Sequence, residues 1–208
     1  MDTFERFRAD LFPGYPRENS SMATALFLEI QHCYSRNRHY HTLTHIRNCL
    51  DVFDFVSHGA PEKNAIRAAI YYHDVVYDTK AKDNEERSAD YAVKRLRMAG
   101  YSRDFCDRVA RLVLATKHEG GLTDVNEQVL ADVDLSELAV DWTTFRANTE
   151  KVRREYAHVS DEDFRSGRAA FLSGMLERKN IYYSRPFQFL FEARARENMH
   201  RSIADLLA

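Results

Sequence analysis

The feature that most constrains the fold is the scarcity of residues that break regular secondary structure. The 208-residue chain contains seven glycines and four prolines, which is about 5% of its residues, whereas average usage is about 12%. All-β sandwiches and barrels need frequent turns, so this composition disfavours them. No segment alternates apolar and polar residues at period two. The sequence therefore predicts an all-α fold with about eight or nine helices.

Apolar periodicity and helix-boundary residues predict where the helices lie. Asp83 followed by Glu86 resembles a capping box, and proline suits the first turn of a helix. Residues 1–19 are expected to be irregular, with a turn at Pro13-Gly14. We expect helices over about 20–35, 42–58, 83–100, 102–120 and 125–139, and others that start at Pro61, Asp141, Ser160 and Pro186.

The chain shows no internal repeat and no long linker, so it is predicted to form one domain over residues 1–208. The core is expected over about 20–140, and a helical extension over about 141–208. A hydrophobic content of 44% with 13 Phe, 11 Tyr and one Trp excludes disorder. The net charge of −2 offers no broad basic surface, so long nucleic acids are not expected as partners.

The sequence also predicts where the protein works. No apolar run approaches the roughly 20 residues that span a bilayer, and the charged first residues lack the apolar core of a signal peptide. Cys33, Cys49 and Cys106 show no CxxC spacing and indicate reduced thiols in the core. A cytoplasmic protein with no membrane partner is therefore expected.

Histidines are concentrated in the segment Arg-His-Tyr-His-Thr-Leu-Thr-His-Ile, residues 38–46. His41 and His45 are four residues apart and share a face if both are helical. A neutral imidazole in the interior can bind a metal when a second partner fixes its tautomer. The alternative is a histidine-rich surface loop, and spacing alone favours neither.

His73 and Asp74 lie in a strongly apolar segment. A buried carboxylate needs a cation beside it, either a metal or an Arg or Lys. Asp132 and Asp134 lie about 200° apart on a helix, so both cannot face one site. Asp134 shares the inward face of Leu130, which leaves a metal ligand or a structural ion pair, whereas Asp132 is predicted to be a solvent-exposed charge.

Lys117 and His118 precede a pair of glycines at the end of a predicted helix. Basic residues at this position interact favourably with the helix dipole, which is a sufficient structural explanation. A role toward a substrate remains the alternative.

The order His45, then His73-Asp74, then Asp134 resembles the HD-domain superfamily of metal-dependent phosphohydrolases. Tyr40-His41-x-x-x-His45 and Asp134-Leu-Ser resemble motifs of the cyclic-nucleotide phosphodiesterases, a branch of that superfamily. The wider chain is similar to uncharacterised bacterial proteins described as predicted metal-dependent HD phosphohydrolases. Tyr77-Asp78 stands where the phosphodiesterases carry a further histidine, so the resemblance does not imply cyclic-nucleotide specificity.

The resemblance implies an HD-domain helical bundle in which His45, His73, Asp74 and Asp134 bind a metal. This mixed nitrogen and oxygen set suits Mn²⁺, Fe²⁺, Co²⁺, Ni²⁺ or Zn²⁺, with Mg²⁺ as a further option, and suits Ca²⁺ less. Asp74 could also bridge to a second metal. The remaining predicted roles are a proton donor at His41, assistance to proton transfer from Glu86 or Glu85, and phosphate binding by Arg38, Lys117 and His118.

The expected function is hydrolysis of a small phosphorylated metabolite or nucleotide by a metal-dependent phosphomonoesterase or phosphodiesterase. A bound metal lowers the pKa of its water and polarises the phosphoryl group. Two alternatives remain open at this point. One is a metal-binding regulatory protein without catalysis, and the other is an HD-type di-iron oxygenase.

Overall fold

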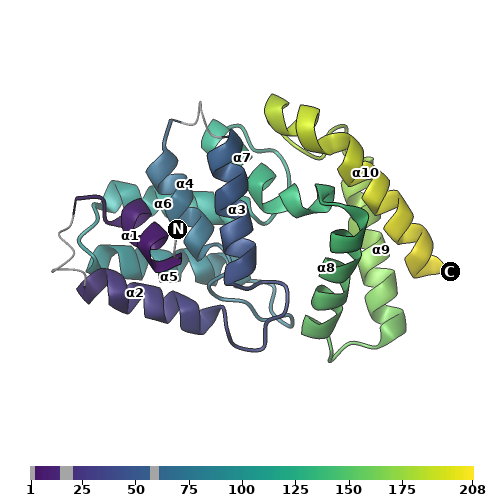
Figure 1. Cartoon of the computed structure of the whole chain (residues 1–208), viewed down its shortest axis with the longest axis horizontal. Helices are drawn as coiled ribbons and strands as arrows, with labels where there is room; N and C mark the ends of the chain where they lie inside the picture. The colour runs from purple at the N-terminus through teal and green to yellow at the C-terminus, as the bar shows by residue number, and fades with distance from the viewer. Residues whose placement is uncertain (1–2, 15–20, 57–60) are drawn as a thin grey trace.

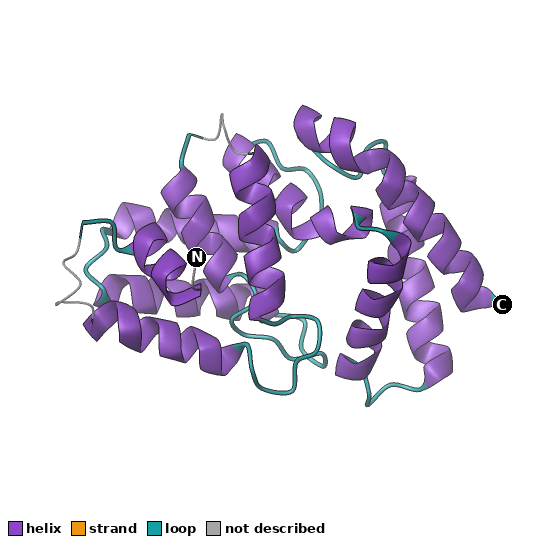
Figure 2. Cartoon of the chain, viewed as in Figure 1, coloured by secondary structure: helices purple, strands orange, loops and turns teal. Residues whose placement is uncertain are grey.

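The computed structural model describes residues 3–14, 21–56 and 61–208, which form an all-α bundle without strands in these ranges (Figure 2). The predicted fold class is therefore confirmed. In chain order the described elements are α1 (Thr3–Leu11), α2 (Ser21–Cys33), α3 (Leu43–Val56), α4 (Lys63–Tyr72), α5 (Asn84–Met98), α6 (Arg103–Ala115), α7 (Val125–Asp134), the 3-10 helix η3 (Leu135–Ala139), α8 (Trp142–Glu155), α9 (Asp161–Glu177) and α10 (Arg185–Leu207).

Helix α4 is the centre of the first group of helices. It packs against α1, α3, α5, α6 and α7, and Figure 1 shows these elements gathered around it. Ile66, Ile70 and Tyr72 are each fully buried, so the C-terminal half of α4 lies inside the core. The segment that directly follows α4, which starts with His73 and Asp74, therefore starts in the protein interior.

The helices α8, α9 and α10 form a second group beside the first (Figure 1). Helix α10 packs on α9, α8 and η3. The side-chain amide of Asn198 in α10 donates to the carbonyl oxygens of Leu138 at 2.9 Å and Val140 at 2.8 Å. Through these contacts η3 connects the two groups.

Asp132 contradicts its predicted exposure, because its exposed fraction is 0%. Its carboxylate accepts the backbone N–H groups of Tyr183 at 2.7 Å and Ser184 at 2.8 Å. These N–H groups precede α10, more than 45 residues away in sequence. The helical periodicity of the sequence placed Asp132 on the outer face of α7, which predicted exposure to solvent. In the structure the segment before α10 covers that face, so Asp132 is buried.

The sequence predicted helix caps correctly where the capping side chain and the N–H group that it accepts are only a few residues apart. Ser102, Asp141 and Ser160 each accept a backbone N–H at the start of α6, α8 and α9. Pro186 lies in the first turn of α10, as expected. Helix α4 begins at Lys63, two residues after the expected Pro61.

Several predicted boundaries were wrong. Residues Thr3–Leu11 form α1 instead of an irregular segment, because Phe7 and Leu11 are buried in the core. Asp83 makes no capping bond to α5, and Glu86 binds Lys117 instead. The helix expected over 125–139 is interrupted at Asp134, where η3 follows. The predicted cap at Ser20 and the predicted end of the 42–58 helix lie outside the described residues.

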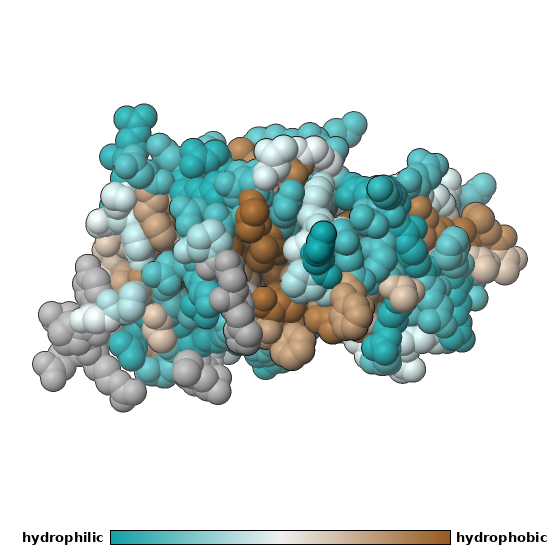
Figure 3. Space-filling view, turned by 90° about the horizontal axis from the view of Figure 1, so that it is seen from above, coloured by the Kyte–Doolittle hydropathy of each residue, from teal (hydrophilic) through white to brown (hydrophobic). Residues whose placement is uncertain are grey.

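The surface of the protein is mostly polar. In the view of Figure 3, apolar side chains gather in the middle of the face, between two polar regions. None of the helices in the described ranges is long and apolar enough to cross a membrane.

Candidate metal centre and its cavity

Two buried imidazoles point at each other where α3 meets the end of α4. His45 lies in the first turn of α3, and His73 directly follows α4, with its backbone N–H still bonded to Ala69 O at 2.8 Å. Both residues are 2% exposed. Their Nε2 atoms are 3.3 Å apart. Two nitrogen donors from different helices therefore converge on one point.

Two carboxylates complete this cluster. Asp134 Oδ1 lies 3.2 Å from the Nε2 atom of His45 and 3.4 Å from that of His73. Asp74 Oδ2 lies 3.1 Å from His73 Nε2. Ligand atoms about 2.1 Å from one ion are roughly 3–3.4 Å apart, depending on its geometry. His45, His73 and Asp134 thus have the spacing of a single metal site, Asp74 lies beside His73, and His45, His73 and Asp74 form one group that could hold an ion.

A hydrogen bond orients the His73 ring from its far side, and a carboxylate lies behind the His45 ring. His73 Nδ1 lies 2.9 Å from the carbonyl oxygen of Ile70, so Nδ1–H donates and Nε2 keeps its lone pair for a metal. His45 Nδ1 lies 3.8 Å from Glu137 Oε1. The Glu137 carboxylate accepts Asn48 Nδ2 at 2.6 Å. A carbonyl and a carboxylate behind the rings are the usual partners of metal-binding histidines.

The charges of the cluster favour a cation at its centre. Burial opposes protonation of His73, but Asp74 and Asp134 nevertheless hold its pKa well above the ordinary value. Burial also opposes ionisation of Asp134, yet His73 and His118 hold its pKa well below the ordinary value. The carboxylates therefore stay ionised and need positive charge beside them. Bound protons or a divalent metal supply that charge, and metal binding displaces the protons.

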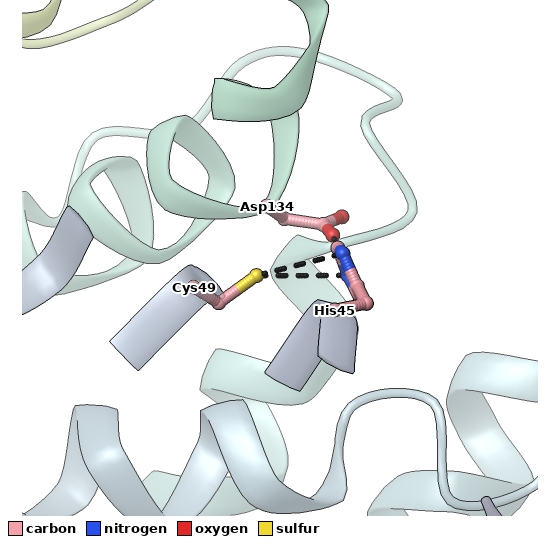
Figure 4. Close-up of side chains that lie close together, drawn as sticks. All are labelled: His45, Cys49 and Asp134. Atoms are coloured by element: carbon pink, nitrogen blue, oxygen red, sulfur yellow. Dashed lines mark hydrogen bonds and ion pairs between the residues drawn. The ribbon is translucent and has the colours of Figure 1, made fainter. Parts of the chain in front are cut away.

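Cys49, which the sequence indicated only as a reduced thiol in the core, lies next to this cluster. Its Sγ is 3.6 Å from His45 Nε2 and 3.8 Å from His45 Nδ1. Figure 4 shows the thiol and the Asp134 carboxylate both pointing toward the His45 ring. His45, Cys49 and Asp134 form a second group that could hold an ion. The sequence analysis did not include Cys49 as a ligand.

His41 precedes α3 and is held by a residue from the second group of helices. Its Nδ1 lies 2.7 Å from Glu155 Oε2, and Glu155 Oε1 accepts the backbone N–H groups of His39, Tyr40 and His41 at 2.7–3.0 Å. The ring also lies 4.1 Å from that of Tyr77. These bonds lower the pKa of Glu155 to about 2, against the opposing effect of burial. His41 is thus fixed beside the metal ligands without joining them.

Arg38 supports the site from behind. Its guanidinium donates to the carbonyl oxygens of Asp74 at 2.5 Å and Val75 at 3.0 Å, and it lies over the ring of Tyr34 at 4.9 Å. Its donors are directed at the backbone that carries Asp74. Arg38 is absent from the cavity wall described below, and its acceptors are backbone carbonyl groups, so its predicted contact with a phosphate stays a prediction.

The three other predicted residues lie near the end of α6. His118 Nε2 is 2.8 Å from Asp134 Oδ2, which places His118 next to a metal ligand. Lys117 Nζ is 2.5 Å from Glu86 Oε1 and 3.7 Å from Glu119 Oε1. Lys117 is therefore already paired. The Glu86 carboxylate is directed to the surface, which disfavours its predicted catalytic role.

A cavity of about 580 Å³ opens in front of the ligands, between the two groups of helices. His45 and His73 are buried behind its wall and do not line it. Glu85 lines the cavity, whereas Glu86 does not. The predicted residues that line it are His41, Asp74, Lys117, His118 and Asp134. The second group of helices contributes Val152, Tyr156, Val159, Asp163, Phe164, Gly167, Arg168 and Phe171.

The sequence analysis missed Glu155 and Arg168 as parts of the site. Glu155 reaches its partners across 114 to 116 residues, and no local pattern reports such a contact. Arg168 stands in an ordinary amphipathic helix, where a single arginine suggests a solvated surface. Glu155 reaches the site only through its bonds to the segment before α3, and Arg168 reaches it only because α9 lines the cavity.

No protein-family model matches this chain, and no curated protein and no solved structure matches it either.

Proposed function

We propose that this protein is a metal-dependent phosphohydrolase of the HD type that acts on a small phosphorylated metabolite or nucleotide. The observation that carries the proposal is the convergence of His45 Nε2, His73 Nε2 and Asp134 Oδ1 within 3.2–3.4 Å of one another. Asp74 joins them at the wall of a cavity. The donor set favours Mn²⁺, Fe²⁺, Co²⁺, Ni²⁺ or Zn²⁺. Such a metal, when bound, supplies a Lewis acid and an acidified water.

His41 is proposed as the proton donor to the leaving group. It lines the cavity, and Glu155 at Nδ1 fixes the orientation and the tautomer of its ring. The opposite nitrogen, Nε2, is then available to a leaving oxygen. A positioned proton donor typically contributes about 10²–10⁴-fold in rate.

Glu85 takes the proton-transfer role that the sequence analysis gave to Glu86 or Glu85. Its carboxyl lines the cavity. Burial, and then the charge of Asp74, raise its pKa, so it can hold a proton closer to neutrality than a solvated glutamate does. Glu86 instead pairs with Lys117 at the surface. His118 is the proposed phosphate contact, since it lies beside Asp134 on the wall.

The cavity favours a compact substrate. About 580 Å³ is within the usual range for small-molecule sites. The chain has a net charge of −2, which gives no broad surface for polyanions. Cys33, Cys49 and Cys106 are free thiols, which favours the reducing cytoplasm as the proposed location.

The test is a panel of nucleotides, sugar phosphates and p-nitrophenyl phosphate, assayed with Mn²⁺, Co²⁺, Ni²⁺ and Mg²⁺. Chelator and the Asp74→Ala protein give the background, and Asp90→Asn, an exposed change on α5, is the matched control. We expect wild type and Asp90→Asn to release phosphate or a nucleoside monophosphate. No turnover above the Asp74→Ala background would exclude the proposal. In that case, bound iron together with O₂ consumption would indicate an HD-type di-iron oxygenase. A bound metal with neither phosphate release nor O₂ consumption would indicate a metal-binding regulatory protein.

A further inference from the structure

Arg168 is a cation on the cavity wall that pairs with no carboxylate among the described residues. It lies in the middle of α9 and lines the cavity. Within the described part of the chain, its Nε atom is buried and has no hydrogen-bond partner. No described acidic side chain pairs with the guanidinium, although Asp163 lines the same cavity. A buried charge without a counterion is costly, so such groups are normally paired.

The surroundings of Arg168 are aromatic and apolar. Its guanidinium lies 5.3 Å from the centre of the Phe171 ring. The ionisable groups whose charges act on it are the phenols of Tyr40, Tyr77 and Tyr156, while burial lowers its pKa. Arg168 stands on α9, in the second group of helices, whereas the candidate metal ligands stand on α3, on α7 and directly after α4. Arg168 therefore lines the cavity from the group of helices opposite to the one that carries the metal ligands.

Apolar side chains also line the cavity. Leu135 and Leu138 of η3 and Val152 of α8 line the same cavity as Asp134 and Arg168. The first group of helices thus presents candidate metal ligands to the cavity, the second group presents a guanidinium, and the apolar side chains offer contact to the body of a ligand. Guanidinium binds phosphate and carboxylate through paired, charge-assisted hydrogen bonds.

We propose that Arg168 binds a second anionic group of the substrate, remote from the phosphoester that is hydrolysed. This inference rests on the proposed function and narrows its substrate class to phosphoesters with two anionic ends. Sugar bisphosphates, nucleoside bisphosphates and phosphorylated carboxylic acids have this chemistry. Arg168 acts as a specificity-determining residue, and it takes no part in proton transfer.

The test compares substrates with one and with two anionic groups on matched variants. The probes are fructose 6-phosphate and fructose 1,6-bisphosphate, adenosine 5′-monophosphate and adenosine 3′,5′-bisphosphate, and p-nitrophenyl phosphate. The variants are Arg168→Met, Arg168→Lys and the control Arg165→Met, which changes an exposed arginine of the same helix. We expect Arg168→Met to lower kcat/KM for at least one two-anion substrate by about 10- to 100-fold. Arg168→Lys should restore part of this loss.

Two results would overturn the inference. One is an equal loss of kcat/KM for p-nitrophenyl phosphate and for every two-anion probe that is hydrolysed. The other is a two-anion preference that Arg168→Met leaves unchanged. The melting temperature adds an independent readout, because removing an unpaired buried charge should leave it unchanged or raise it. A structural arginine would lower it.

Failure of the proposed function is distinguished by a binding measurement. Calorimetry with the two-anion and one-anion probes, on chelator-treated protein, needs no turnover. If nothing is hydrolysed but wild type binds a two-anion probe at least about tenfold more tightly than Arg168→Met does, the anion site stands while the hydrolase proposal fails. If no two-anion probe is hydrolysed or bound in preference to its one-anion match, the inference is wrong.

Discussion

The imidazole of His41 and the carboxylate of Glu155 lie 2.7 Å apart, across 114 residues of sequence. His41 belongs to the segment before α3, and Glu155 is the last residue of α8. The same carboxylate accepts three backbone N–H groups of that segment. The second group of helices therefore fixes the position of His41 as well as lining the cavity.

The first prediction concerns His41 itself. His41→Ala should keep the bound metal, because His41 is not among the four converging ligands, and should lower turnover by about 10²–10⁴-fold. Elemental analysis and the phosphate-release assay measure the two effects. Full activity would exclude the proton-donor role, and loss of metal would make His41 a ligand.

The second prediction concerns pH and Glu155. Its pKa is lowered from 4.5 to about 2 in the folded protein, so its ionised form contributes stability that is fully present above pH 4.5. That contribution is lost as the pH falls toward 2. Glu155→Gln should therefore be less stable than wild type by about 2–3 kcal/mol at neutral pH, and the difference should shrink below pH 4.5. Urea unfolding at a series of pH values measures it. A difference that does not vary with pH would contradict the prediction.

The third prediction concerns the metal ligands. Wild type should hold about one transition metal per chain, and His73→Ala should lose it, because His73 Nε2 lies within 3.4 Å of two other ligand atoms. His32→Ala, a change at an exposed histidine of α2, is the matched control. Equal metal content in wild type and His73→Ala, measured by elemental analysis, would refute the ligand set.

The fourth prediction separates two neighbouring carboxylates. Asp134→Asn should release the metal, whereas Asp132→Asn should retain it and lose about 1–3 kcal/mol of unfolding free energy. The reason is that Asp132 accepts the N–H groups of Tyr183 and Ser184. Melting curves and metal content on the same samples distinguish the two roles. Metal loss in Asp132→Asn with an unchanged melting temperature would reverse the assignment.

The fifth prediction concerns Arg38. Arg38→Ala should destabilise the protein by about 2–4 kcal/mol, because the carbonyl groups of Asp74 and Val75 lose their donors and Tyr34 loses a stacked cation. Metal affinity and kcat should fall together. A raised KM with unchanged stability and metal affinity would instead support direct contact with the phosphate.

The parts of the fold that could be predicted are those that local sequence controls. Ser102, Asp141 and Ser160 cap helices through bonds that span three residues. Apolar periodicity also placed Asp134 on the face that meets α3. The same reasoning failed for Asp132, whose partners at residues 183 and 184 come from a different part of the chain.

The candidate ligands could be named from the sequence, but the rest of the site could not. His73, Asp74 and Asp134 lie in apolar segments, where such residues are unusual, and His45 lies in a histidine-rich segment. The resemblance to HD-domain proteins is what combines these four residues into one predicted ligand set. Glu155 and Arg168 stand in amphipathic helices where charged residues are ordinary. For Arg38 the local sequence pointed to a different partner from the one in the structure. Its place beside the histidines predicted contact with a substrate phosphate, whereas its acceptors in the structure are the backbone carbonyls of Asp74 and Val75.

The order of the chain also bears on the order of assembly. His45, His73, Asp74 and Asp134 all precede residue 135, whereas Glu155 and Arg168 follow it. During synthesis the N-terminal part of a chain emerges and folds first, and contacts over more than 100 residues form late because their loop closure is costly. The candidate metal site can therefore form on the ribosome before α8 and α9 exist. Docking of these later helices then adds Glu155, which orients His41, and Arg168, the proposed anion-binding residue.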